Sequence, residues 1–157
     1  VYLLGERKQM SPFLRRYIWP CGLDVDLSRM RACASLLEGT HDFTALRGHN
    51  SVVSDPVRTI CSIQIRPGEK IWRIYVTGSG FLYHMVRNIA GLLVDAGRGL
   101  MNPERLQKVL DARDRTQLGV TAPAQGLCLL QVYFEALTEE TVRRAEEQAL
   151  FPWNPEK

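Results

Sequence analysis

The fold is decided by residues 57–97, VRTICSIQIRPGEKIWRIYVTGSGFLYHMVRNIAGLLVDAG. Apolar and polar residues alternate over 57–65 and again over 72–77, and Pro67-Gly68 lies between the two runs. A period of two is typical of a strand with one buried face, and Pro-Gly is typical of a turn. The stretch therefore predicts an antiparallel hairpin. We expect its buried side chains to be Val57, Cys61, Ile63, Ile65, Trp72, Ile74 and Val76.

A helix is expected next, over Phe81–Ala96. Its apolar residues recur every three or four positions and form one stripe: Leu82, Met85, Val86, Ile89, Leu93 and Ala96. The opposite face carries His84, Arg87, Gly91 and Asp95. Because a mid-helix glycine costs about 1 kcal/mol relative to alanine, Gly91 suggests that another segment approaches the helix closely. The alternative, which periodicity alone favours, is a solvated face with a tolerated glycine.

The elements on either side of this stretch complete an α+β pattern. They are a strand end at residues 2–4, a helix from the N-cap Asp26 to Glu38, a helix opened by Asn102 and Pro103, a central strand over 126–134 (GLCLLQVYF) and a last helix from Thr138. Strands and helices alternate irregularly, with hairpin-length turns. The sequence therefore predicts an α+β fold, with a mainly antiparallel sheet and helices packed on one face. We divide it into a domain over 1–137 and an acidic helix with an extended tail over 138–157.

The composition is that of an ordinary globular protein. Of its 157 residues, 45% are apolar and 24% charged, and no apolar run approaches the ~20 residues needed to cross a bilayer. No basic segment followed by an apolar one indicates a secretory signal, so we expect a cytoplasmic protein without membrane contact. None of the four cysteines lies in a C-x-x-C pair, so we expect reduced thiols that act as small apolar residues.

The charge is mildly basic and unevenly distributed. The net charge is +3, and the last twenty residues carry five acidic against three basic side chains. A basic body suits a polyanionic partner, although many proteins with this balance bind no nucleic acid. The three histidines, His41, His49 and His84, lack the spacing of metal ligands, and no glycine loop or cofactor motif is present. We therefore assign neither a metal nor a cofactor.

Residues 78–91, GSGFLYHMVRNIAG, resemble the signature GFLxHMVRNIxG of the tRNA pseudouridine synthase A family. Four further blocks resemble the family in its order and at its spacing: SPFLRRYIW (11–19), LLEGTHDFTALR (36–47), DPVRTI (55–60) and TAPAQGLCLLQVYF (121–134). The chain is thereby identified as similar to this family from about Tyr2 to Phe134. The resemblance implies the C-terminal half of the pseudouridine synthase fold.

The family converts uridine to pseudouridine in the anticodon stem and loop of tRNA, without cofactor or metal. An aspartate attacks the nucleoside, the glycosidic bond breaks, and the uracil turns and is rejoined through carbon. By motif position, the arginine that pairs with the aspartate corresponds to Arg87, and the leucine that closes the pocket corresponds to Leu127. A guanidinium keeps a nearby carboxylate ionised, and a leucine gives a flipped base an apolar wall. From the residues alone, Leu127 would be strand core.

Two residues of the family's active site have no counterpart here. The catalytic aspartate belongs to an RTDxGVHA motif upstream of the signature, and the chain has none. Residues 115–122, RTQLGVTA, imitate the motif downstream, with Gln117 at the aspartate position, which we interpret as coincidence because an amide is no nucleophile. The family's stacking tyrosine would precede Val1. We therefore expect that the N-terminal half is missing, that the chain alone is inactive, and that an exposed apolar surface makes it self-associate.

Five residues are candidates for RNA binding: Arg15, Arg16, Arg47, Arg58 and His84. The arginines lie in family-like blocks, near loops where each is placed to contact a phosphate. The resemblance implies tRNA as a partner and a homodimer for the full protein. The alternative function is a non-catalytic RNA-binding or dimerisation module of the same fold, and a third is an α+β domain that binds a small molecule.

Overall fold

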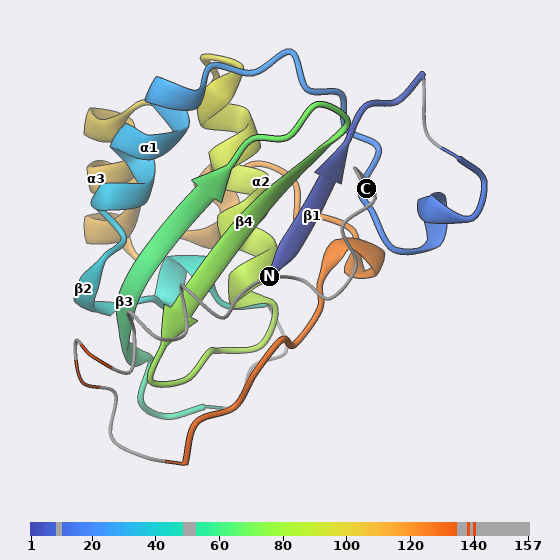
Figure 1. Ribbon diagram of the computed structural model, residues 1–157. Coiled ribbons are helices and arrows are strands. Elements are labelled where there is room, and N and C mark those ends of the chain that lie inside the picture. The colour runs from blue at the N-terminus through green and yellow to red at the C-terminus, as the bar shows by residue number, and fades with distance from the viewer. Residues whose placement is uncertain (9–10, 49–52, 135–137, 139, 141–157) are drawn as a thin grey trace.

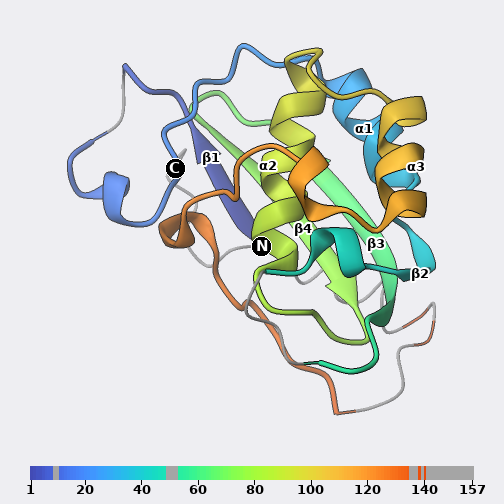
Figure 2. The same cartoon turned by 180° about the vertical axis from the view of Figure 1, so that it is seen from behind.

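A computed structural model describes residues 1–8, 11–48, 53–134, 138 and 140. Four strands form one antiparallel sheet in the order β1-β4-β3-β2: β1 Tyr2–Gly5, β2 Gly39–Asp42, β3 Val57–Arg66 and β4 Ile71–Gly78. Three α-helices cover one face of it: α1 Leu27–Ser35, α2 Met85–Gly97 and α3 Pro103–Ala112 (Figures 1 and 2). The predicted α+β class, with an antiparallel sheet and helices on one face, is confirmed.

Four short 3₁₀ helices complete the described elements: η1 Leu14–Arg16, η2 Thr44–Leu46, η3 Arg115–Gln117 and η4 Ala124–Gly126. Within the described ranges, no helix is long and apolar enough to cross a membrane. The last helix predicted from Thr138, and the division of the chain at residue 137, fall where the structure describes only residues 138 and 140.

The hairpin β3–β4 matches the prediction except at its start. Ile63, Ile65 and Ile74 are buried as expected. The register shifts between Ile60 and Ser62, and because one extra residue inverts the faces of a strand, Ile60 rather than Val57 enters the core. The prediction that Val57 is buried is wrong, since its side chain is 44% exposed.

Capping residues set the ends of α1 and α3. Asp26 Oδ1 accepts hydrogen bonds from the backbone N–H groups of Ser28 and Arg29, at 2.8 and 3.2 Å, and so opens α1 as predicted. This helix ends at Ser35, three residues earlier than expected. Asn102 Oδ1 accepts from the N–H of Arg105 at 2.8 Å and opens α3 as predicted.

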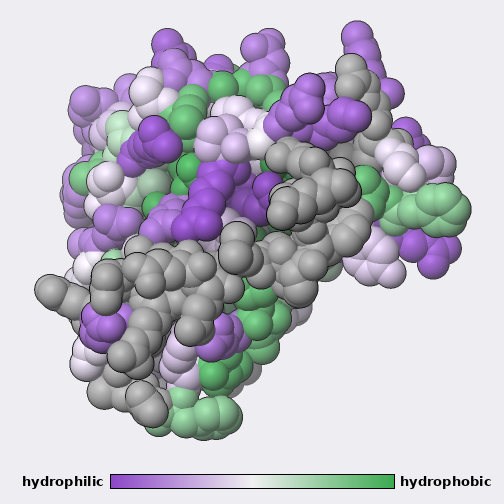
Figure 3. Space-filling model, in the orientation of Figure 1, coloured by the Kyte–Doolittle hydropathy of each residue, from purple (hydrophilic) through white to green (hydrophobic). Residues whose placement is uncertain are grey.

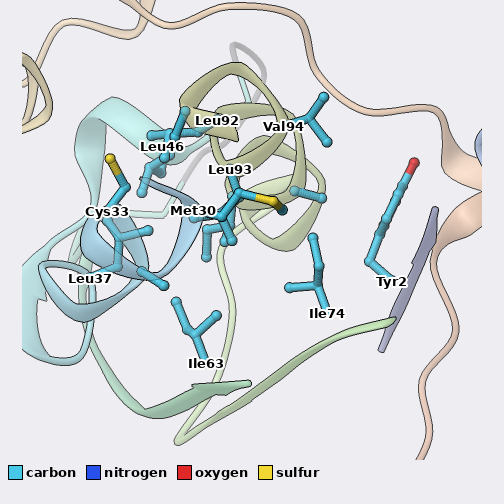
Figure 4. Close-up of a cluster of buried hydrophobic side chains, with 14 of the residues drawn as sticks. Tyr2, Met30, Cys33, Leu37, Leu46, Ile63, Ile74, Leu92, Leu93 and Val94 are labelled. Carbon is cyan, nitrogen blue, oxygen red and sulfur yellow. The ribbon is translucent and has the colours of Figure 1, made fainter. Parts of the chain in front are cut away.

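Helix α2 begins at Met85, four residues later than the apolar stripe predicts. His84 adopts a left-handed backbone, with φ of 62°, which interrupts the helical geometry before Met85. Once begun, the helix is buried on almost every side, and its Leu92, Leu93 and Val94 contribute to the main hydrophobic core (Figure 4). A helix enclosed to this degree holds the groups on its first turn in fixed positions.

The segment 126–134 is not the central strand that its composition predicts. It contributes one isolated bridge, between Tyr2 and Leu127, and the N–H of Cys128 donates to the Val1 carbonyl at 2.9 Å. Leu129 and Phe134 are 77% and 99% exposed, because no described segment packs on their outer side. The apolar run therefore pairs only through Leu127 and Cys128 with the start of β1, and its later residues extend beyond that strand instead of lying within the sheet.

The sheet face opposite the helices carries a second, smaller apolar cluster: Val1, Leu3, Ile18, Ile71 and Tyr75, with Leu14, Cys128 and Leu130 packed against it. Beside this cluster, the guanidinium of Arg66 lies 5.0 Å from the centre of the Tyr75 ring. Hydrophilic side chains gather over β3 and β4 on this face (Figure 3). The helix-free face is therefore partly apolar and partly polar.

Candidate functional site

Arg87 lies on the first turn of α2 and is fixed at one end of its guanidinium. Its Nε donates to the Ala122 carbonyl at 2.7 Å, and the N–H of Ala122 donates to the Arg87 carbonyl at 3.2 Å. Arginine has five N–H donors, and in the described part of the chain the terminal nitrogens of Arg87 have no hydrogen-bond or ion-pair partner. The half-buried side chain is thus held in place with its charged end available to an anion.

The segment that fixes Arg87 crosses α2 at Gly91. A Cβ at this position would overlap the Val120 carbonyl oxygen, and Gly91 is buried. The close approach suggested by the mid-helix glycine is confirmed, and the solvated-face alternative is wrong. One helical turn after Gly91, the Asp95 carboxylate occupies the space that a Cβ on Gly119 would need. Burial raises the pKa of Asp95. Residues 119–122 therefore lie along the Arg87–Gly91–Asp95 face.

A buried asparagine ties this segment to the rest of the fold. Asn88, 2% exposed, donates through Nδ2 to the Leu46 carbonyl at 2.7 Å. Its Oδ1 accepts from Arg115 Nη2 at 3.1 Å and from Thr121 Oγ1 at 2.7 Å. Every polar atom of the Asn88 side chain has a partner, as a buried amide requires.

Arg115 is the one functional candidate that the sequence reasoning missed. Besides Asn88, its guanidinium donates from Nη2 to Thr121 Oγ1 at 2.8 Å and from Nη1 to the Gly119 carbonyl at 3.2 Å. Burial lowers the pKa of Arg115. The sequence signal for it is that arginine opens residues 115–122, the segment in which Gln117 takes the position of the family's aspartate. The structure puts Gln117 on η3, where it bonds Asp114.

His84 stands between two cavities. Its imidazole stacks on the Tyr83 ring with centroids 3.8 Å apart. Burial lowers the pKa of His84, and the positive charges of Arg87 and Arg115 lower that pKa further. Since the ordinary pKa of histidine is near 6.5, the imidazole is neutral at pH 7. It can therefore donate or accept a hydrogen bond without carrying charge.

The larger cavity, about 610 Å³, opens at the end of β4. The loop 78–82, the start of α2 and the segment 127–133 line it. Leu127 is part of this lining and is 41% exposed, so the strand-core interpretation of this residue is wrong. A smaller cavity of about 370 Å³ also includes His84 in its lining, which comprises Gly48, Tyr83, His84, Arg115, Thr116, Leu118 and Thr121.

Arg87 itself lines neither cavity, but its charge reaches groups beside both. It lowers the pKa of His84, and it opposes the burial that raises the pKa of Tyr2. The Tyr2 hydroxyl donates to the Pro123 carbonyl at 2.6 Å, next to the carbonyl that anchors Arg87. The geometry thus joins the start of β1, the start of α2 and residues 119–127 around one guanidinium.

The other predicted arginines differ in their surroundings. Arg58, at the start of β3, donates to the carbonyls of Asp55 and Val57 at 3.1 and 2.6 Å. Arg47 donates to the Val53 carbonyl at 3.5 Å. Arg15 and Arg16 are exposed on η1, on the far side of β1 (Figure 1). None of the four lines either cavity.

Among the described residues, no three histidine, cysteine or acidic side chains group closely enough to hold a metal ion. Cys33 is buried, and burial raises the pKa of its thiol. The groups that carry chemistry near α2 include two guanidinium groups, the His84 imidazole, the Asp95 carboxylate and the Tyr2 hydroxyl.

The chain is similar to tRNA pseudouridine synthases over most of its length. A family model described as tRNA pseudouridine synthase matches residues 33–135. The chain is 45% identical over 134 residues to tRNA pseudouridine synthase A of Thermotoga sp. (strain RQ2), and 40% identical to that of Bacillus subtilis (strain 168). Each match covers 85% of this chain and 54% of the relative. The chain thus spans about half the length of the curated relatives it matches, and it belongs to the tRNA pseudouridine synthase family.

Proposed function

We propose that this chain forms the arginine-bearing wall of an active site that isomerises uridine to pseudouridine in the anticodon stem-loop of tRNA. The observation that carries the proposal is the state of Arg87. Its Nε is engaged by the Ala122 carbonyl at 2.7 Å, and its terminal nitrogens are unpaired within the described ranges. A guanidinium held by one nitrogen presents its remaining donors in a fixed direction, which suits a carboxylate.

In this proposal Arg87 pairs with the nucleophilic aspartate that the family resemblance implies. Burial next to substrate would raise the pKa of such a carboxyl group, and a protonated carboxyl is a poor nucleophile. The adjacent positive charge lowers that pKa and keeps the group ionised. The aspartate must come from outside these 157 residues, which contain no RTDxGVHA motif.

Leu127 supplies the apolar wall for the target base. Its exposed side chain faces the larger cavity, whose volume of about 610 Å³ lies in the usual range for a small-ligand pocket. A uridine flipped out of the RNA loses its stacking partners, and an apolar side chain against the uracil face replaces part of that contact.

Contacts to the RNA backbone are assigned to Arg15, Arg16, Arg47 and Arg58, with His84 as a neutral hydrogen-bonding group. Arginines on the surface can position a long polyanion through its phosphates without reading its bases. The proposal includes a homodimer, which the family resemblance implies. It also places the protein in the cytoplasm, where a tRNA-modifying enzyme meets its substrate.

The alternative is a non-catalytic RNA-binding or dimerisation module. The exposed apolar side chains of Leu129, Val132 and Phe134 favour it, since they offer a surface for another chain. In that case, tRNA binding or dimerisation would occur without isomerisation.

The release of tritium from tRNA labelled at carbon 5 of uracil separates these functions, because rejoining the base through that carbon expels its hydrogen. The assay uses the protein that joins this chain to an RTDxGVHA-containing half, with the chain alone as the matched control. We expect release from the joined protein and none from the chain alone. Binding without release would support the module, and absence of both would refute an RNA function.

A further inference from the structure

The smaller cavity is lined by the cationic side chain of Arg115, which has no role in the proposed isomerisation. Arg115 reaches it from η3, which lies beside η2 and α2 on the helical side of the molecule (Figure 2). Its three hydrogen-bond acceptors, the Gly119 carbonyl, Asn88 Oδ1 and Thr121 Oγ1, are all neutral. In the described ranges Arg115 has no ion pair. Its positive charge is therefore oriented without being neutralised.

Arg115 has N–H groups without a partner in the described ranges, and these can donate to an anion. Three of the five N–H groups of the guanidinium are used, and Nε and one hydrogen of Nη1 are left. The nearest acid in sequence, Asp114, accepts from Thr116 through Oδ1 and from Gln117 through Oδ2. These bonds direct the Asp114 carboxylate to its own turn and not to the guanidinium.

The rest of the lining suits a phosphodiester. The same cavity is lined by the neutral imidazole of His84, the Tyr83 ring and Gly48. Gly48 leaves no room for a side chain, since a Cβ there would lie 2.7 Å from the Tyr83 ring. At about 370 Å³, the cavity is large enough for a phosphate group with part of its sugar.

We propose that Arg115 binds a backbone phosphate of the RNA in this second cavity, next to the flipped uridine, with His84 as a hydrogen-bonding neighbour. The proposal rests on the proposed function for the identity of the ligand. The shared chemistry is that of a phosphate monoanion, and an RNA backbone or a free anion can supply it. Because His84 lines both cavities, this phosphate belongs to a nucleotide adjacent to the one in the larger cavity.

The test is the salt dependence of tRNA binding by this chain, measured by fluorescence anisotropy over a series of KCl concentrations. Each phosphate contact contributes about 0.7–0.9 to the slope of log affinity against log salt. We expect Arg115→Gln to lower the slope by about that amount, and Arg115→Lys to weaken binding while keeping the slope. Arg105→Gln is the matched control, because Arg105 is exposed on α3, donates to the Leu100 carbonyl and lines neither cavity.

A purely structural role for Arg115 would give both variants the wild-type slope, whatever their melting temperatures, and would overturn the proposal. If the wild-type chain alone binds no tRNA, the anion site is decided by NMR of His84 in sulfate and in chloride at equal ionic strength, and the proposed function is judged separately by tritium release from the joined protein. A sulfate anion beside the imidazole raises the pKa of His84 in the wild type and not in Arg115→Gln. An unchanged His84 pKa in the wild type would refute the site itself.

Discussion

Replacing Gly91 by alanine tests how the site is assembled. In a solvated helix this change stabilises a protein by about 1 kcal/mol, because glycine is a poor helix former. Here the new methyl group overlaps the Val120 carbonyl, and forcing an extra carbon into a packed contact costs about 1–3 kcal/mol. If the segment moves away, the two hydrogen bonds between Arg87 and Ala122 are lost as well, at about 1 kcal/mol each.

We therefore expect Gly91→Ala to lower the free energy of unfolding by about 1–3 kcal/mol. For a chain of 157 residues, that corresponds to a fall in melting temperature of roughly 2–12 °C. Urea denaturation and calorimetry both report it. Gly80→Ala is the matched control, because its Cβ meets only Arg58 side-chain atoms at 3.8 Å, and its stability should change by less than about 0.5 kcal/mol. A Gly91→Ala protein as stable as the wild type, or more so, would refute the contact.

Three further predictions follow from hydrogen bonds and charges near α2. Tyr2→Phe removes the bond to Pro123 and should lower the free energy of unfolding by about 0.5–1.5 kcal/mol in urea denaturation, where no loss would contradict it. Arg87→Gln removes a nearby cation and should raise the His84 pKa in an NMR titration, whereas an unchanged pKa would argue against this electrostatic effect. Because the folded state lowers the His84 pKa, its contribution to stability is complete above about pH 6.5 and is lost as the pH falls below that value. His84→Asn, a side chain that tolerates the left-handed backbone, should lose less stability between pH 7 and pH 5 than the wild type, and an equal loss would argue against the shift.

The sequence predicts the parts of the fold that depend on local patterns. The hairpin, the capped starts of α1 and α3 and the apolar stripe of α2 follow from periodicity and N-cap chemistry, which act within a few residues. The bulge near Cys61 and the left-handed His84 are not visible in such patterns. Both depend on how distant segments pack against the strand or helix.

The segment 126–134 shows the limit most clearly. Its composition is that of a buried strand, yet Leu129 and Phe134 are exposed because nothing in the described chain covers them. Composition reports what a segment is able to bury, and not whether a neighbour is present to bury it.

The candidate site was predictable in part. The resemblance selects Arg87 and Leu127, and Gly91 alone indicates a close neighbour for α2. Whether Arg87 and Leu127 have their assigned roles stays a prediction. Arg115 could not be found in this way, because its partners Asn88 and Thr121 are 27 and 6 residues distant and no short motif connects them.

The most direct test of the account is pseudouridine formation by Arg87 variants of the protein that joins this chain to the aspartate-bearing half, with tRNA affinity measured in parallel. We predict that Arg87→Ala lowers turnover by at least about 100-fold, the scale expected when one electrostatic group is removed from an active site. Its tRNA affinity should stay largely intact, and Arg105→Ala, the exposed cation on α3, should be fully active. Normal turnover by Arg87→Ala would contradict the central claim that this guanidinium holds the catalytic carboxylate.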